Sequence, residues 1–168
     1  MLTHQKHNIE PVFDENSKVL ILGSFPSVKS RESAFFYGHP QNRFWKILAE
    51  IFCEPVPQTV EEKKELLLKH NIAVWDVIAS CDIEGSSDSS IKNVVPNDIG
   101  IILEQADIQR ICLNGGTAYR LFCKYHKESG LPPIQQLPSS SPANARYRLV
   151  DLVEEWKKVL LIIRKEKE

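Results

Sequence analysis

The stretch that decides the fold begins with KVLILG at Lys18–Gly23 and continues as SFPSVKSRESAFFYGHPQNRFW through Trp45. A compact apolar run that ends in glycine is typical of a buried strand. The pattern then changes to a helical period over Arg43–Cys53, where apolar residues recur on one helix face. A strand, a long connection and a helix in this order indicate an α/β unit.

The rest of the chain repeats this alternation of strands and helices. Thr59 and Glu62 form a capping box that begins a helix, and Asn97 is expected to cap another. Such alternation predicts a mostly parallel sheet covered by helices on both faces. The further strands are expected at Ile72–Ile78, Arg110–Leu113 and Ile134–Leu137, and the further helices at Val60–His70, 97–104, Thr117–Glu128 and Leu149–Arg164.

Length and composition favour one globular domain over residues 1–168, with a charged end at about 164–168 that is expected to fray. A hydrophobic content of 42% argues against a disordered, collagen-like or coiled-coil chain. A net charge of -1 argues against a generic cationic nucleic-acid binder. The four cysteines form no CxxC pair, so no zinc or iron–sulfur motif is indicated. No apolar run is long enough for a membrane span or a signal core, which favours an intracellular protein.

Ligands of open parallel sheets bind beyond the carboxyl ends of the strands. The segments that follow the strands are therefore expected to form the ligand site: Gly23–Asn42, Asp76–Pro96, Asn114–Thr117 and Pro138–Arg148. The first is long for a strand-to-helix connection, which usually has a functional reason. Its rings either stack on a planar substrate or form the loop's own small core, and at least two are assigned to the core. These residues are Phe25, Phe35, Phe36, Tyr37 and His39.

The last of these segments reads LPSSSPANARYR at residues 137–148. Hydroxyls and backbone N–H groups of such a loop suit phosphate oxygens. The alternative is a simple lead into the final helix, with Pro142 or Asn144 near its start.

Three motifs carry a family resemblance: GSFPS after the first strand, YGHPQNRFW before the first helix, and LPSSSPANARYR after the last strand. Together they resemble the uracil-DNA glycosylase superfamily. With VWDVIASCDIEGSSDSSIKNVVPND, the chain is most similar to the DNA-deoxyinosine (hypoxanthine-DNA) glycosylase family, over about residues 19–155. The resemblance implies a three-layer α/β/α sandwich with a four-stranded parallel sheet. It also implies an enzyme that flips a damaged base and hydrolyses its N-glycosidic bond without a metal or other cofactor.

The resemblance further implies a base pocket around the first two motifs. Tyr37 matches the position of a stacking aromatic in mismatch-specific relatives. Asn114 could read the base edge through a bidentate amide contact, or could serve only the turn that follows it. The expected pocket residues are Gly23, Ser24, Phe25, Pro26, Ser27, Phe36, Tyr37 and Asn114.

The catalytic residues depart from the common family pattern. Many relatives carry Asp, Asn or Glu where this chain has Phe25, so the usual water activator is missing. Asn42 is the expected substitute, either by holding water through its carbonyl oxygen or by donating its NH₂ to the base. Asn42 could instead cap the following helix. His39 could hydrogen-bond or protonate a purine nitrogen, or could only fix the loop.

The DNA backbone is expected to meet the basic residues near these motifs and the serine-rich loop. Each basic residue could instead be a solvated surface charge. The expected DNA contacts are Lys29, Arg43, Ser139, Ser140, Ser141, Pro142, Asn144 and Arg146.

The sequence therefore predicts a monomeric, intracellular, monofunctional DNA glycosylase that acts on deaminated bases, foremost hypoxanthine in deoxyinosine. One alternative is uracil or mismatch activity on the same scaffold. A second is a damage-binding module without catalysis, which Phe25 makes conceivable, and a third is a small-molecule α/β enzyme with an aromatic pocket.

Overall fold

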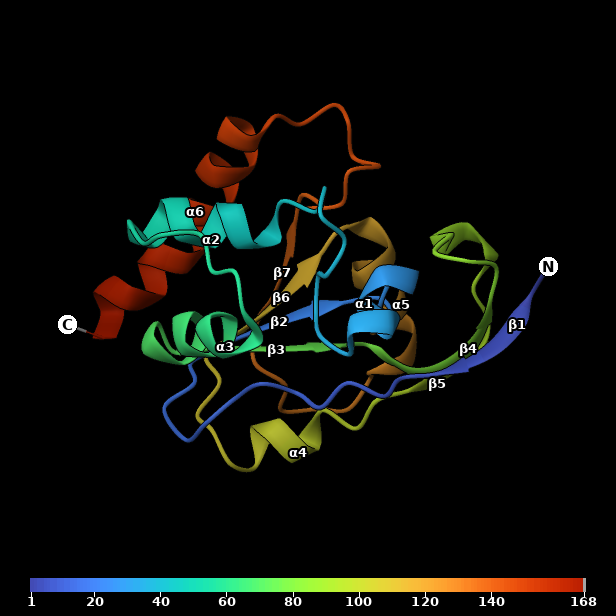
Figure 1. Cartoon of the computed structure of the whole chain (residues 1–168). Coiled ribbons are helices and arrows are strands. Elements are labelled where there is room, and N and C mark those ends of the chain that lie inside the picture. Colours follow the sequence, from blue (N-terminus) through green and yellow to red (C-terminus); the bar gives the residue numbers. More distant parts are fainter. Residues whose placement is uncertain (168) are drawn as a thin grey trace.

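The computed structural model describes residues 1–167, with side chains through Leu161. Its centre is a parallel sheet in the order β3-β2-β6-β7 (Figure 1). The predicted α/β class and four-stranded parallel sheet are confirmed. The strands are β2 (Val19–Gly23), β3 (Ile72–Asp76), β6 (Arg110–Asn114) and β7 (Ile134–Leu137).

Helices cover both faces of this sheet. The chain passes from β2 outward to β3 and then reverses to β6 and β7. Because parallel crossovers are right-handed, this reversal puts the two sets of connecting helices on opposite faces. The first set is α2 (Phe44–Phe52) and α3 (Val60–Lys69), and the second is α4 (Gly100–Leu103) and α5 (Gly116–Tyr125).

The last helix, α6 (Leu149–Lys167), packs against α2 and completes the first helical layer (Figure 1). The fraying expected at about 164–168 stays a prediction, because the structure describes no side chains there. No helix among the described residues combines the length and apolarity needed to cross a membrane.

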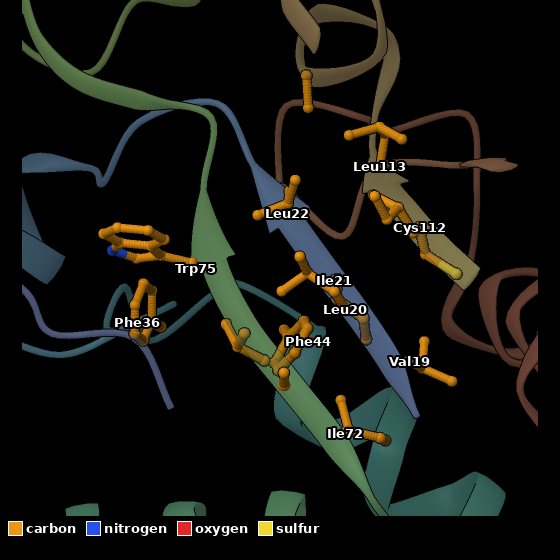
Figure 2. Packing of buried hydrophobic residues seen from close by; sticks show 14 of the residues in the cluster. Val19, Leu20, Ile21, Leu22, Phe36, Phe44, Ile72, Trp75, Cys112 and Leu113 are labelled. Atoms are coloured by element: carbon orange, nitrogen blue, oxygen red, sulfur yellow. The ribbon is translucent and has the colours of Figure 1, made fainter. Parts of the chain in front are cut away.

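β2 and β3 are buried at every position, and β6 is buried at its three inner residues, as expected for a sheet covered on both faces. Figure 2 shows Leu20 and Ile21 of β2 among the core side chains, with Phe44 of α2 and Cys112 of β6. The pairing aligns Gly23 with Asp76 and Asn114 with Leu137. The carboxyl ends of the four strands therefore meet at one edge.

The prediction of one strand over Ile72–Ile78 is wrong at its end. β3 stops at Asp76, and β4 (Ile78–Ile83) leaves for a second, antiparallel sheet in the order β1-β4-β5. The other strands of that sheet are β1 (Thr3–Lys6) and β5 (Lys92–Pro96). The apolar run continues through the bend because Val77 and Ile78 are fully buried as well, so hydrophobicity alone did not mark the break.

Asn97 secures this bend and is not the helix cap predicted for it. Its side-chain NH₂ donates to the carbonyls of Asp76 (2.9 Å) and Ile78 (3.1 Å). The amide of Gly100, at the start of α4, is instead satisfied by Asp98 Oδ1 at 3.0 Å. Asn97 is buried, and a buried amide needs such internal partners.

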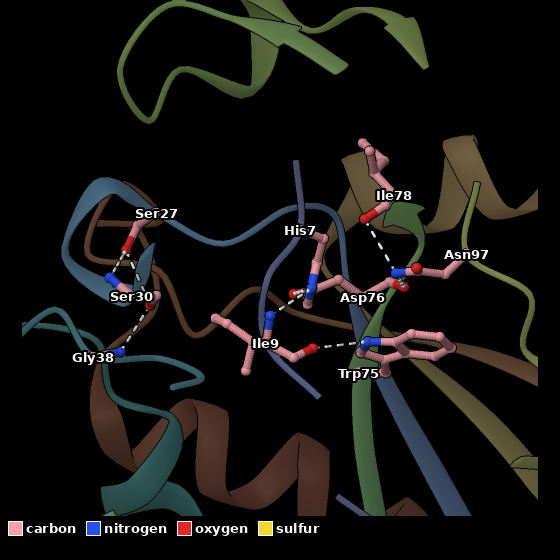
Figure 3. Close-up of polar contacts among 9 residues, drawn as sticks. All are labelled: His7, Ile9, Ser27, Ser30, Gly38, Trp75, Asp76, Ile78 and Asn97. Atoms are coloured by element: carbon pink, nitrogen blue, oxygen red, sulfur yellow. Dashed lines mark hydrogen bonds and ion pairs between the residues drawn. The ribbon is translucent and has the colours of Figure 1, made fainter. Parts of the chain in front are cut away.

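The long connection after β2 is ordered by serine hydroxyls and contains a short helix, α1 (Val28–Ser33), that was not predicted. The Ser27 hydroxyl accepts from Ser30 N at 3.2 Å and caps α1. The buried hydroxyl of Ser30 accepts in turn from Gly38 N at 2.9 Å (Figure 3).

The rings of this connection largely form a core, in line with the assignment of at least two of them to packing. Phe25, Phe35 and Phe36 are all buried. Phe35 stacks on Trp45, with ring centroids 6.1 Å apart. The connection is therefore a packed wall with only part of its surface available to a ligand.

Candidate active site

A cavity of about 370 Å³ lies at the carboxyl edge of the parallel sheet, within the size range of small-molecule and base pockets. All eight residues predicted for the base pocket line it, as do both residues predicted for catalysis. Its lining comprises Gly23, Ser24, Phe25, Pro26, Ser27, Ser30, Phe36, Tyr37, His39, Asn42, Asp76, Ser86, Asp88, Asn114, Ser139, Ser140, Ser141, Pro142 and Ala143.

Four of the residues predicted to contact DNA stand apart from this lining. Lys29 and Arg146 are exposed, and Lys29 lies 3.8 Å from Glu32 in an ion pair. A phosphate contact stays a prediction for both. Asn144 donates its side-chain NH₂ to Ser139 O at 3.0 Å, so it stabilises the serine-rich loop.

Arg43 is engaged inside the protein by its two terminal nitrogens, and its phosphate contact stays a prediction. Its guanidinium donates to the carbonyls of Tyr147, Ser141 (2.7 Å) and Asn144 (3.1 Å). These bonds tie the start of α2 to the serine-rich loop. Arg43 therefore positions the loop, because its two terminal nitrogens already have carbonyl partners.

A chain of hydrogen bonds joins the second motif to the other strand ends. Asn42 Oδ1 accepts from Phe44 N (3.0 Å) and from the Ser140 hydroxyl (2.8 Å). Asn114 Oδ1 accepts from Ser140 N (3.0 Å), and its NH₂ donates to the Ser140 hydroxyl (2.9 Å). Ser140 is fully buried, so the network is fixed by protein contacts.

The backbone donors in this network settle the orientation of both amides. An N–H group must face an amide oxygen, so Phe44 N identifies the oxygen of Asn42 and Ser140 N identifies that of Asn114. Both lone pairs of Asn42 Oδ1 are thereby taken. Its NH₂ has no hydrogen-bond partner among the described residues, and Asn42 lines the cavity. Asn42 thus supports the start of α2 and still offers a donor, while the amide of Asn114 is engaged with Ser140.

Tyr37 combines a supported ring with a buried hydroxyl. One ring face stacks on Phe44, with centroids 4.0 Å apart and planes 16° from parallel. The hydroxyl is buried without a hydrogen-bond partner in the described part of the chain. Burial foremost, and then the negative charge of Asp76, raise the pKa of this phenol, so it stays a donor at neutral pH.

His39 holds the turn before α2. Its Nδ1 accepts from Gln41 N (3.1 Å), and its carbonyl accepts from Asn42 N (3.0 Å). With Nδ1 acting as acceptor, the neutral ring carries its proton on Nε2. The loop-fixing role is thereby visible in the contacts, and the ring also lines the cavity.

Two serines of the third motif retain hydroxyl hydrogens for a ligand. Ser139 Oγ accepts from Ser141 N, and Ser141 Oγ accepts from Ala143 N, each at 3.1 Å. Neither hydroxyl donates to another described residue. Both therefore suit phosphate or sugar oxygens, which accept hydrogen bonds.

A buried His–Asp pair at the cavity floor was missed by the sequence analysis. His7 Nε2 lies 2.8 Å from Asp76 Oδ2, and both side chains are at most 5% exposed (Figure 3). Ile9 N donates to His7 Nδ1 at 3.3 Å, so the neutral imidazole places its proton on Nε2 and donates to the carboxylate. Asp76 ends β3 directly beside Gly23 of β2.

Because Gly23 has no side chain, the carboxylate of Asp76 and the hydroxyl of Tyr37 can lie close to it at the cavity floor. A Cβ at residue 23 would lie 2.5 Å from Asp76 Oδ1 and 3.0 Å from the Tyr37 hydroxyl oxygen. A carboxylate and a phenol, one acceptor and one donor, therefore lie beside the same strand end. The one available signal for Asp76 was an aspartate inside the apolar run IAVWDVI, at the end of a strand.

Comparisons with known proteins agree with this arrangement. The model of the uracil DNA glycosylase superfamily matches residues 10–161. A hypoxanthine DNA glycosylase of Methanosarcina acetivorans is 38% identical, over 84% of this chain and 90% of its own length. One of Methanosarcina barkeri is 34% identical, over 67% of this chain and 72% of its own length.

A solved structure extends this similarity to the fold. The solution NMR structure of a candidate uracil DNA glycosylase from Methanosarcina acetivorans matches with a TM-score of 0.82 and 32% identity. The match covers 96% of this chain and 99% of that one. With its three motifs gathered around one cavity, the chain belongs to the uracil DNA glycosylase superfamily.

Proposed function

We propose that this protein is a monofunctional DNA glycosylase that removes hypoxanthine from deoxyinosine in DNA and leaves an abasic site. The observation that carries the proposal is the cavity, where a free amide donor, a buried carboxylate and a supported ring meet. The curated relatives, both named hypoxanthine DNA glycosylases, support the same substrate.

The floor of the cavity suits the edge that deamination creates. Hypoxanthine presents an N1–H donor beside its C6 carbonyl acceptor, whereas adenine presents an acceptor beside a donor. Asp76 would accept from N1–H, and the Tyr37 hydroxyl would donate to the carbonyl. Adenine would place a lone pair against the carboxylate, which leaves buried polar groups unpaired and is costly.

Cleavage breaks the C1′–N9 bond, and the electron pair leaves with the purine. The sugar develops oxocarbenium character while the base becomes anionic. The unpartnered NH₂ of Asn42 is a fixed donor for that developing negative charge, as in other electrostatically stabilised transition states. Water then adds to C1′, and the purine takes up a proton.

Substrate profiling tests the proposal. Oligonucleotides containing deoxyinosine, deoxyuridine or deoxyxanthosine, in single and double strands, are incubated with the protein and cleaved at abasic sites with alkali. We expect strand scission of the deoxyinosine substrates above all others. Binding of these strands without scission would instead support a damage-binding module, and preference for deoxyuridine would support a uracil enzyme.

Uracil is the second candidate base, because its N3–H and C4 carbonyl repeat the donor–acceptor edge of hypoxanthine. We further propose action inside the cell, since the substrate is DNA, as a monomer, since residues of one chain line the cavity, and without a metal, since the cleavage described above needs only side chains and water. Size-exclusion chromatography, together with cleavage in excess chelator, tests the oligomeric state and the metal requirement.

Asp76→Asn is expected to lower single-turnover cleavage of deoxyinosine DNA by about 10- to 100-fold. This matches the roughly 1.5–3 kcal/mol of a hydrogen bond to a charged group. The new amide would accept from His7 through its oxygen and turn its NH₂ toward the N1–H of the base. Asp82→Asn is the matched control, because Asp82 pairs with His4 at 3.0 Å on the second sheet, away from the cavity. Equal rates for Asp76→Asn and wild type would remove Asp76 from recognition.

A further inference from the structure

A polar loop from the second sheet forms one wall of the cavity. Residues 84–91, with the sequence EGSSDSSI, connect β4 to β5. Ser86 Oγ accepts from Val28 N at 2.9 Å, and Gly85 O accepts from the Arg31 guanidinium at 3.0 Å. Two contacts therefore dock this loop on α1, beside the first motif.

The third contact of this loop brings a carboxylate to the first motif. The Ser24 hydroxyl donates to Asp88 Oδ1 at 3.1 Å. Asp88 begins a short 3₁₀ helix, Asp88–Ser90, and lines the cavity together with Ser24 and Phe25. Its other oxygen, Oδ2, has no hydrogen-bond partner among the described residues, and the residue is exposed. Water can therefore reach an unoccupied carboxylate oxygen at this wall.

Two other side-chain acceptor oxygens of the cavity are engaged within the protein, and the proposed base contact takes a third, Asp76 Oδ1. Asn42 Oδ1 accepts from two donors, and Asp76 Oδ2 accepts from His7. Phe25 cannot hold water by hydrogen bonds. Asp88 lines the cavity with Phe25 and contacts the neighbouring Ser24, although it lies far from both in the sequence.

We propose that the carboxylate of Asp88 is the general base that activates the attacking water, which makes it a further catalytic residue. The inference rests on the proposed glycosylase activity. Water bonds to C1′ through an oxygen lone pair and gives one proton to Asp88 Oδ2. The C1′–N9 bond breaks, its electron pair leaves with the purine, the purine anion takes a proton from solvent, and Asp88 returns its proton to solvent. This hydrolysis requires no oxidant, reductant or metal.

The surroundings of Asp88 make it a stronger base than an ordinary aspartate. The residue as a whole is exposed, yet the partial burial of its carboxylate is the main cause of a raised pKa, and the negative charge of Asp76 adds to it. The hydrogen bond from Ser24 and the positive charge of Arg120 on α5 oppose this rise of the pKa. A further titratable group near Asp88 is the thiol of Cys81 on β4, whose pKa the charge of Asp88 helps to raise. A raised pKa brings a carboxylate closer to the acidity that favours general-base catalysis.

Single-turnover rates test the role of Asp88. Asp88→Asn is expected to slow cleavage of deoxyinosine DNA about 30- to 100-fold, near the low end for a general base, because a sugar cation is already reactive. Asp88→Glu should recover part of the loss. In the wild type the rate should fall as acid protonates Asp88, and this acid limb should disappear in Asp88→Asn. Binding of uncleavable 2′-fluorodeoxyinosine DNA should stay equal or become tighter.

Glu32→Gln serves as the control, because it removes the same charge from an exposed residue of α1 that does not line the cavity. Wild-type rates in Asp88→Asn would overturn the role of Asp88. Equal losses in Asp88→Asn and Asp88→Glu, together with a lower melting temperature, would show a structural role and would also overturn it. Absence of cleavage by the wild-type protein would refute the proposed function itself, a separate result.

Discussion

Asn42→Ala is expected to reduce single-turnover cleavage of deoxyinosine DNA by about 100- to 1,000-fold, the usual cost of removing one preorganised donor from a developing anion. The Asn42 NH₂ is the donor in question, because both lone pairs of its oxygen are filled by Phe44 N and Ser140. Quenched-flow or gel-based assays with excess enzyme measure the chemical step directly.

Asn42→Asp separates the donor from the support of the helix start. The N-cap of α2 is Arg43, not Asn42, but Asn42 Oδ1 accepts from Phe44 N. Aspartate keeps both oxygen contacts, whereas Asn42→Ala loses them as well as the donor. We therefore expect Asn42→Asp to keep the melting temperature of the wild type and to lose as much cleavage activity as Asn42→Ala. Gln41→Glu is the control, since it adds the same charge at the exposed neighbouring residue. If Asn42→Asp cleaved at the wild-type rate, the donor role would be wrong, and His39 would become the candidate.

The place of the site could be predicted from local sequence. Buried strands that end in Gly23 and Asn114 are visible as apolar runs followed by glycine-containing turns. A parallel sheet brings such ends to one edge, whatever the sequence distance between them. This rule places the three motifs together, and the cavity lining agrees with it.

The internal partners of polar residues could not be predicted in the same way. Arg43 and Asn114 are chemically suited to DNA, yet carbonyls of the 141–147 loop and the buried Ser140 already engage them. Residue type states what a side chain can bind but not which partner lies within reach. Whether such a side chain binds DNA or a group inside the protein is decided by long-range packing, which a single sequence does not display.

The acidic groups of the cavity were missed for a related reason. Asp76 lies inside an apolar run that continues into β4, so the end of the strand is hidden. Its partner His7 comes from the N-terminal segment, and Asp88 belongs to a loop of the second sheet, which was not predicted. All three depend on the course of the chain after Val77, where β4 leaves the parallel sheet.

Phe44→Ala is expected to lower the free energy of unfolding by about 3–5 kcal/mol, as for other buried phenylalanines, and the melting temperature by roughly 10 °C. Phe44 is fully buried. Its ring contacts Tyr37 at 4.0 Å, Trp45 at 4.8 Å and Trp156 at 5.7 Å between centroids. It therefore joins α2, α6 and the cavity wall, and its removal leaves a void among three aromatic rings.

Phe44→Leu distinguishes packing from support of the site. It keeps most of the apolar volume, so we expect a loss of about 1 kcal/mol, while the stacked partner of Tyr37 disappears. A double-mutant cycle with Tyr37→Leu should give a coupling of about 0.5–1.5 kcal/mol, the usual range for an aromatic pair. Val150→Ala, at an exposed position of α6, should change stability by less than about 0.5 kcal/mol. Zero coupling between residues 37 and 44 in chemical denaturation would mean that the stack does not hold Tyr37 in place, and the cavity wall would then depend on the turn at His39 instead.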